Sequence, residues 1–173
     1  MKVLVDTNVL IQILAPNATG LTDPDTQEEL DRLPERAVAF VANIESKGAV
    51  LLIPTPVLAE FLIGVEAEKF QEYLDILNGN ACFEVADFGT AAAIECAQLP
   101  SKQELAQISP EQSSKKISYD RQIVSIALAT LADEVWSHDK SLRKIAVSKG
   151  LSVKSLANID PVPTQARLFE DET

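Results

Sequence analysis

The sequence predicts an α/β fold, in which a mainly parallel central sheet of about five strands is flanked by helices. Short apolar runs alternate with longer amphipathic stretches, as they do in βαβ units. Two of these runs, residues 3–5 and 50–53, show no alternation of polar and apolar side chains, which is typical of strands covered on both faces. The length of 173 residues fits one domain with a sizeable core.

Five apolar runs account for the strands of this sheet, at residues 2–5, 49–53, 82–86, 134–137 and 151–154. Helices are expected in the amphipathic stretches between them, at residues 35–47, 56–77, 88–99, 120–132 and 140–149. Thr55 and Pro56 mark the start of the second helix, and Gly150 is the expected C-cap of the last one.

Three polar stretches interrupt this alternation. Residues 15–34, rich in Pro, Asp and Thr, are expected to form a loop or a short helical excursion, and residues 100–118 form a second polar stretch. Residues 156–173 are Pro-containing and acidic, and we expect a C-terminal tail that is flexible or packs on another chain. The folded domain is therefore expected to span residues 1–155.

The charge is unevenly distributed. The net charge of −11 argues against non-specific binding to nucleic acid, which depends on Lys and Arg neutralising phosphates. Residues 101–154, however, carry 9 basic and 6 acidic residues, so this segment, at +3, could face an anion, or it is only a solvated helical surface.

The sequence also bears on the compartment. No uncharged stretch approaches the roughly 20 residues of a membrane span. Cys82 and Cys96 show neither a metal-binding spacing nor a disulfide framework, which suits a reducing compartment. The apolar start is too short for a secretory signal peptide. We therefore expect a cytoplasmic protein that does not cross a membrane.

Three Asp residues lie at predicted helix starts. Asp6 follows the first strand, Asp120 opens the helix at 120–132, and Asp139 follows the fourth strand. Open α/β sheets place their active sites at the carboxyl ends of strands. Each Asp also has a structural explanation, because Asp is a favoured N-cap and an acidic residue in a first turn stabilises the helix dipole.

A fourth carboxylate, Glu60, lies on the helix that Thr55 begins and points away from its apolar stripe. Its neighbours three and four positions away are uncharged, so no helical ion pair supports it. A carboxylate among apolar neighbours needs a partner, because burying an unpaired charge is costly, and a metal ion is one candidate.

The four carboxylates together predict a metal site. Carboxylates that converge at one end of a sheet repel one another unless they are protonated or a cation lies among them. Oxygen-only ligands favour the hard ions Mg²⁺ or Mn²⁺, and such a site suits phosphodiester hydrolysis. Beside Asp120, the basic residues Lys115, Lys116 and Arg121 could hold a phosphate or screen the carboxylate.

Four motifs of the chain resemble those of the PIN-domain family. They are Val3-Leu4-Val5-Asp6-Thr7-Asn8-Val9-Leu10, Pro56-Val57-Leu58-Ala59-Glu60-Phe61, Tyr119-Asp120-Arg121-Gln122-Ile123 and Ser137-His138-Asp139-Lys140-Ser141-Leu142. Their carboxylates follow the family's order Asp, Glu, Asp, Asp, and the resemblance covers roughly residues 1–155.

This resemblance implies a parallel sheet wrapped by helices and metal-dependent endonucleolytic cleavage of RNA. The metal ligands, which are also the catalytic residues, would be Asp6, Glu60, Asp120 and Asp139. Asn8 and Ser137 would orient these carboxylates through hydrogen bonds. Many bacterial members resemble the VapC-type toxins of toxin–antitoxin pairs, so an antitoxin protein is an expected partner besides RNA, and a homodimer is the expected assembly.

Other classes of protein remain to be weighed. A haloacid-dehalogenase-like phosphatase needs a second Asp two residues after the first, where this chain has Asn8. The sequence does not support a nucleophilic triad, because the chain has one His and no G-x-S-x-G motif. None of its six glycines forms a phosphate-binding loop. The remaining alternative is a catalytically silent PIN-like module that binds a protein partner.

Overall fold

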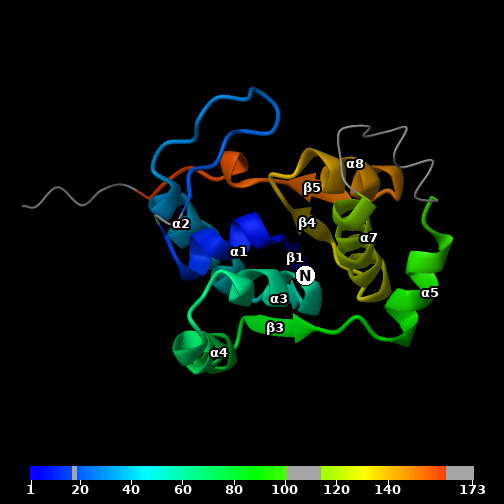
Figure 1. The fold of residues 1–173 in the computed structure, drawn as a ribbon. Coiled ribbons are helices and arrows are strands. Elements are labelled where there is room, and N and C mark those ends of the chain that lie inside the picture. The colour runs from blue at the N-terminus through cyan, green and yellow to red at the C-terminus, as the bar shows by residue number, and fades with distance from the viewer. Residues whose placement is uncertain (17–18, 101–113, 163–173) are drawn as a thin grey trace, which may run out of the picture.

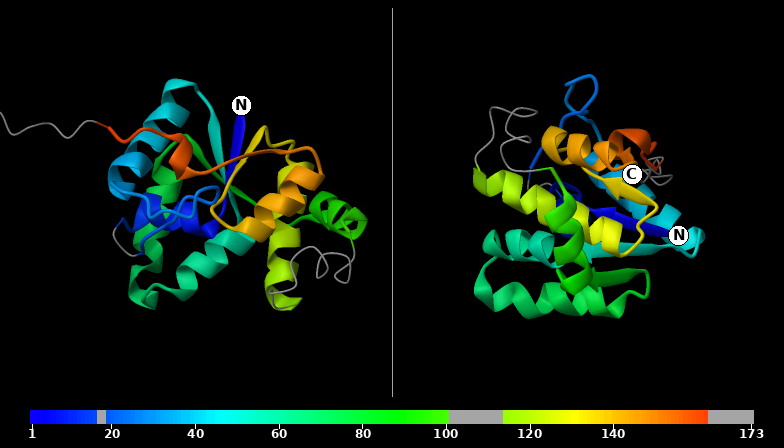
Figure 2. Two further views of the ribbon diagram at one scale, coloured as in Figure 1. Left: turned by 90° about the horizontal axis from the view of Figure 1, so that it is seen from above. Right: turned by 90° about the vertical axis from the view of Figure 1, so that its right-hand side faces the viewer.

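A five-stranded sheet lies at the centre of the molecule, and all of its strand pairs are parallel (Figures 1 and 2). The computed structural model describes residues 1–16, 19–100 and 114–162, with side chains described from residue 118 onward in the last range. The strands are β1 (Lys2–Val5), β2 (Val50–Pro54), β3 (Phe83–Ala86), β4 (Glu134–Trp136) and β5 (Ser152–Lys154). The predicted α/β fold is confirmed, and every strand lies within one residue of its expected bounds.

The middle of the sheet is completely buried. The strand order is β3-β2-β1-β4-β5, so β1 is central and pairs with β2 on one side and β4 on the other. Val3, Leu4 and Val5 on β1 have no exposed surface, and the same holds for Leu51 to Ile53 on β2. Complete burial explains why these runs show no alternation of polarity in the sequence.

Helices pack on the sheet in two groups, which lie on its left and right in Figure 1. One group comprises α1 (Thr7–Leu14), α2 (Leu33–Ser46), α3 (Thr55–Ile63) and α4 (Phe70–Gly79). The other comprises α5 (Thr90–Gln98), α7 (Ser114–Ala129) and α8 (Lys140–Ser148). The two groups meet where α3 contacts α7.

The predicted helix at 56–77 is wrong, because the structure breaks it into α3, the 3₁₀ turn η1 (Ala67–Lys69) and α4. Gly64 ends α3, and its N–H donates to the carbonyl of Phe61 at 3.1 Å instead of continuing the helical ladder. Glu66 then adopts an extended backbone, with φ −64° and ψ 136°. The backbone therefore leaves the helical conformation after Gly64, which the apolar periodicity did not reveal.

The predicted start of the helix at 120–132 is also wrong. Helix α7 begins at Ser114, so Asp120 lies inside the helix and does not cap it. No Gly or Pro lies between Ser114 and Asp120, so nothing in the sequence stops the helix from extending in this direction. The explanation of Asp120 as a first-turn residue is therefore removed by the structure.

The loop between α1 and α2 and the residues after β5 both contact the rest of the domain. Residues 19–32 form the expected loop between α1 and α2, with an antiparallel bridge between Thr22 and Glu29. Residues 156–158 form a 3₁₀ turn, η2 (Leu156–Asn158), in which Leu156 is fully buried. Arg36 on α2 donates to the carbonyl of Ile159 at 2.6 Å, and residues 163–173 lie outside the described residues.

Two further findings concern membrane-spanning helices and the cysteines. Across the ranges that the structure describes, no helix has both the length and the apolar character to cross a membrane. Cys82 and Cys96 are both free thiols, Cys82 being buried.

Candidate active site

The site lies where the sheet reverses its order. From β1 the chain continues to β2 on one side, while β4 pairs with β1 on the other side. In open parallel sheets a crevice forms at this switch point, outside the carboxyl ends of the strands. Asp6 directly follows β1, and its backbone N–H donates to the carbonyl of Trp136, the last residue of β4, at 3.0 Å. The two strand ends that precede Asp6 and Asp139 are therefore joined.

All four predicted carboxylates line one cleft of about 640 Å³. They come from four segments of the chain, namely the end of β1, helix α3, helix α7 and the start of α8. Six further residues complete the lining: Thr7, Asn8, Ile11, Ile63, Tyr119 and Ile123. The structure thus brings Asn8 to the same cleft as the carboxylates.

Asp6 is almost completely enclosed, with 5% of its surface exposed. Its Oδ1 accepts from the backbone N–H of Thr7 at 2.7 Å, and its Oδ2 accepts from the Ser137 hydroxyl at 2.8 Å. Burial, and to a lesser extent the charges of Asp139 and Glu60, raise the pKa of Asp6 to about 6, although these two hydrogen bonds oppose the rise. The ionised Asp6 is therefore held at a cost that a cation would offset.

Asp139 caps helix α8, as the sequence predicts. Its Oδ1 accepts from the backbone N–H groups of Ser141 and Leu142 at 2.7 and 3.1 Å. Its own N–H donates to the Ser137 hydroxyl oxygen at 2.9 Å. Ser137, which is fully buried, therefore joins the two strand-end aspartates through one hydroxyl group.

Glu60 has a partner that the sequence did not identify. Thr7, the residue after Asp6, donates its hydroxyl to Glu60 Oε2 at 2.5 Å across the gap between α1 and α3. The position of Thr7 beside a strand-end Asp is the one signal that could have found it. Asp120 reaches the same cleft from the middle of α7 and is 4% exposed.

Of the three predicted phosphate contacts, the structure describes the side chain of Arg121. Arg121 donates to the carbonyls of Cys96 at 2.5 Å, Leu99 at 3.4 Å and Pro100, so its guanidinium caps the end of α5. This arrangement satisfies carbonyl groups at a helix terminus and uses donors that a phosphate would need. The side chains of Lys115 and Lys116 lie outside the described residues.

The donor chemistry of the cleft fits a hard divalent cation. Its charged groups are all carboxylates, which suit Mg²⁺ or Mn²⁺. Within the described ranges, no three His, Cys, Asp or Glu side chains are close enough to form a ready-made metal cluster. The charges of Asp139 and Glu60 contribute to the raised pKa of Asp6, and a bound cation would offset this repulsion.

Comparison with known proteins agrees with this architecture. The family model described as PIN domain matches residues 3–148. The structure of VapBC2 from Rickettsia felis bound to a DNA fragment from their promoter is similar in fold, with a TM-score of 0.61 and 20% identity over 90% of this chain and 98% of that chain. DNA-bound VapBC from Salmonella typhimurium gives a TM-score of 0.54 and 21% identity over the same shares, 90% and 98%.

At these identities the two solved structures show a common fold and nothing more. Among curated proteins, none matches the sequence significantly. The family model, in contrast, spans most of the chain, including all four segments that carry the carboxylates, from Asp6 to Asp139. On this match, together with the parallel sheet and its cleft, the chain belongs to the PIN-domain family.

Proposed function

We propose that this protein is a Mg²⁺- or Mn²⁺-dependent endoribonuclease that hydrolyses phosphodiester bonds of RNA, and that it is the toxin of a toxin–antitoxin pair. One observation supports the catalytic part most directly. Four carboxylates from four separate segments line a single cleft at the switch point of the sheet. Membership of the PIN-domain family supports nuclease chemistry at this position.

In this proposal Asp6, Glu60, Asp120 and Asp139 hold the cation. When bound, a divalent cation supplies positive charge to the phosphate and activates water for attack. The Ser137 hydroxyl orients Asp6 by donating to its carboxylate, and it orients Asp139 by accepting from the backbone N–H of that residue. The Thr7 hydroxyl orients Glu60. Asn8, which lines the cleft, is a third polar group that we propose to orient the carboxylates.

The substrate is proposed to approach along the wall formed by α7. Tyr119 is 43% exposed and lines the cleft, where its ring can stack on a base. Lys115 and Lys116, on the first turn of the same helix, are the proposed contacts to the phosphate backbone. Arg121 is not assigned this role, because its donors are used at the end of α5.

The partners follow from the same comparison. The two similar structures are of VapBC proteins bound to DNA, and we propose that an antitoxin protein likewise binds this chain. A homodimer is the assembly that we propose for the isolated protein. A catalytically silent module that binds a protein partner is the alternative, and it would need no cation in the cleft.

The deciding experiment is cleavage of single-stranded RNA by the purified protein with Mn²⁺, Mg²⁺ or EDTA, alongside Asp6→Asn and Asp139→Asn. We expect metal-dependent cutting that both variants lose while remaining folded. Full activity in either variant would show that the site is wrongly assigned. If no RNA is cut, calorimetric titration with Mn²⁺ separates a nuclease of narrow specificity, which binds the ion, from the silent module, which does not.

A further inference from the structure

The turn that presents Asp139 is held from several directions. We call residues 137–139 the Asp139 turn. The Ser137 hydroxyl donates to Asp6, and the Ser137 carbonyl accepts from Arg143 Nη1 at 3.2 Å. The next residue, His138, bonds through both of its ring nitrogens. Every residue of the turn therefore has a hydrogen-bond partner outside the turn or on helix α8.

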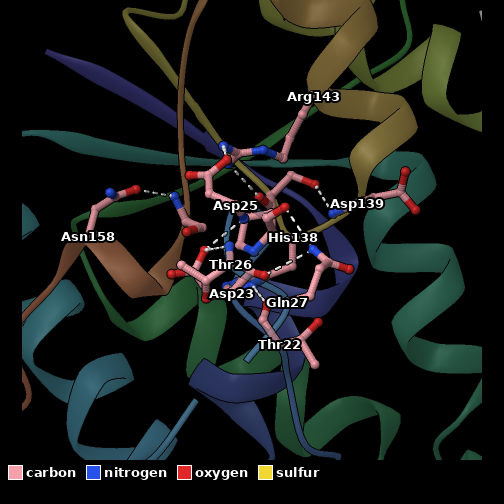
Figure 3. Close-up of polar contacts among 12 residues, drawn as sticks. Thr22, Asp23, Asp25, Thr26, Gln27, His138, Asp139, Arg143 and Asn158 are labelled. Carbon is pink, nitrogen blue, oxygen red and sulfur yellow. Dashed lines mark hydrogen bonds and ion pairs between the residues drawn. The ribbon is translucent and has the colours of Figure 1, made fainter. Parts of the chain in front are cut away.

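Two of these contacts reach the loop between α1 and α2. We call residues 19–31 the clamp loop. His138 Nδ1 lies 2.9 Å from the carbonyl oxygen of Thr22, and Arg143 Nη2 lies 3.4 Å from Asp25 Oδ1. Figure 3 shows His138 among the residues of this loop, with the carboxylate of Asp139 pointing away from them. The loop and the carboxylate thus lie on opposite sides of the turn.

The roles of the two imidazole nitrogens are determined by their partners. The backbone N–H of Leu156 donates to His138 Nε2 at 3.1 Å, so this nitrogen is the acceptor. The proton of the neutral ring then lies on Nδ1, which donates to Thr22. One ring therefore connects the Asp139 turn to two segments that are distant in sequence, the clamp loop and the start of η2.

The clamp loop is itself well anchored. Asp23 Oδ1 accepts from the backbone N–H groups of Asp25 and Thr26 at 2.8 and 3.4 Å. At its base, the Gln12 amide on α1 donates to the carbonyl of Thr19 at 2.8 Å. Leu21 is buried in the core. A loop with these internal and basal contacts can restrain the turn that it touches.

We propose that the clamp loop positions the Asp139 carboxylate at the cleft, with His138 and Arg143 as the positioning residues that connect them. The expected consequence, tighter metal binding, rests on the proposed function. It does not require the loop to contact the cation or the RNA. The hydrogen bonds of Ser141 and Leu142 to Asp139 Oδ1 report the position of this carboxylate even in metal-free protein.

Substitutions of His138 separate the loop contact from the η2 contact. Asn places its amide near the position of Nδ1, so His138→Asn retains a donor for Thr22 and loses the acceptor for Leu156. Gln reaches the position of Nε2, so His138→Gln does the reverse, and His138→Phe loses both bonds. Arg36→Gln is the matched control, because Arg36 bonds Asp31, at the far end of the clamp loop, and Ile159, after η2, and neither bond involves the Asp139 turn.

The first readout is amide hydrogen exchange in metal-free protein, followed by NMR. We expect exchange at Ser141 and Leu142 to rise about tenfold or more in His138→Phe and His138→Gln, and to stay near wild type in His138→Asn and Arg36→Gln. Unchanged exchange in all four variants would overturn the proposal. The opposite ranking, with His138→Asn impaired and His138→Gln intact, would assign the positioning to η2 and overturn the role of the loop.

The second readout is the Mn²⁺ dissociation constant measured by calorimetry. The two variants that lose the Thr22 bond should bind Mn²⁺ about 10- to 100-fold more weakly, the range found when outer partners of metal ligands are removed. In the cleavage assay they should lower kcat and leave KM for RNA unchanged. Wild-type protein that binds no Mn²⁺ while exchange at Ser141 responds as expected would refute the proposed function and support the positioning of Asp139 by the loop.

Discussion

Asp6 and Asp139 occupy equivalent places in the sequence, each between a strand and a helix, and yet the structure supports them differently. Asp6 is enclosed by the sheet, and both of its carboxylate oxygens accept hydrogen bonds from neighbouring core segments. Asp139 is half-buried and bonds the first turn of α8, on a turn that a surface loop restrains. The same local pattern therefore produces one carboxylate held by the core and one held through a loop.

This difference has an energetic consequence. A carboxylate held by the core has lost its water, which is why burial is the largest cause of the raised pKa of Asp6. A carboxylate held through a loop retains solvent and depends on contacts that single substitutions remove. Asp6 should therefore respond to changes of charge, and Asp139 to changes in its support.

The largest effect is expected from removing either charge. Asp6→Asn and Asp139→Asn should each lower RNA cleavage by more than about 100-fold, since loss of a direct ligand should exceed the 10- to 100-fold effect of losing an outer partner. Initial rates at saturating Mn²⁺ test this. Equal loss in both variants would show that the two carboxylates are equivalent in catalysis despite their different support.

The free energy of unfolding should distinguish the same two variants, because Asp6→Asn should stabilise the metal-free protein and yet abolish cleavage. The folded-state pKa of Asp6 is raised from 3.8 to about 6, so its contribution to stability is present below pH 4 and is lost as the pH rises through 6. Above pH 6 in EDTA, Asp6→Asn should raise the free energy of unfolding by up to about 3 kcal/mol. Urea denaturation at pH 5 and pH 7.5 measures this.

A matched control sharpens that prediction. Asp139→Asn should show no comparable stabilisation, because Asp139 is not enclosed in the same way. With saturating Mn²⁺ the wild type should become more stable than Asp6→Asn, since the ion stabilises only a protein that binds it. If Asp6→Asn instead destabilises the metal-free protein at pH 7.5, the ionised Asp6 is not under the electrostatic strain that its burial implies.

Ser137→Ala tests the one side chain that both aspartates share. Its loss leaves Asp6 Oδ2 buried without this donor, at a cost of about 1–3 kcal/mol, and removes the acceptor of the Asp139 N–H. We expect Mn²⁺ affinity to fall about 10- to 100-fold, measured by calorimetry. Ser137→Thr, which keeps the hydroxyl group, is the control. Equal Mn²⁺ affinities in the Ala and Thr variants would contradict the proposed role of this hydroxyl in orienting the aspartates.

A smaller effect is expected at Glu60, because this residue is exposed on α3 and water can replace its partner. Thr7→Val should weaken Mn²⁺ binding by less than about tenfold, whereas Thr7→Ser, which retains the hydroxyl bonded to Glu60, should match the wild type. The same titration measures both. A Val variant weakened as strongly as Ser137→Ala would place Glu60 on a par with the strand-end aspartates.

The smallest effect on catalysis is expected at Arg121. Because its guanidinium bonds carbonyls at the end of α5, Arg121→Gln should lower the free energy of unfolding by about 1 kcal/mol and leave KM for RNA unchanged. Thermal unfolding and steady-state cleavage provide the two numbers. A raised KM with unchanged stability would restore Arg121 as a phosphate contact.

Much of the fold was predictable because burial leaves a local trace. Strands β1 and β2 are enclosed on both faces, so their apolar runs stand out, and α8 lies between an Asp cap and Gly150. The break after α3 was not predictable from periodicity, because the apolar pattern continues past Gly64 while the backbone turns. The start of α7 was missed because an acidic residue inside a helix resembles one at its start.

The sequence by itself determined which carboxylates belong together, since the strand ends and the order Asp, Glu, Asp, Asp are local features of the chain. Only the tertiary structure decided what surrounds each of them. Ser137 reaches Asp6 across 131 positions, Thr7 reaches Glu60 across 53, and Thr22 reaches His138 across 116. Such contacts form when strands pair and helices pack, and no local pattern of residues specifies them.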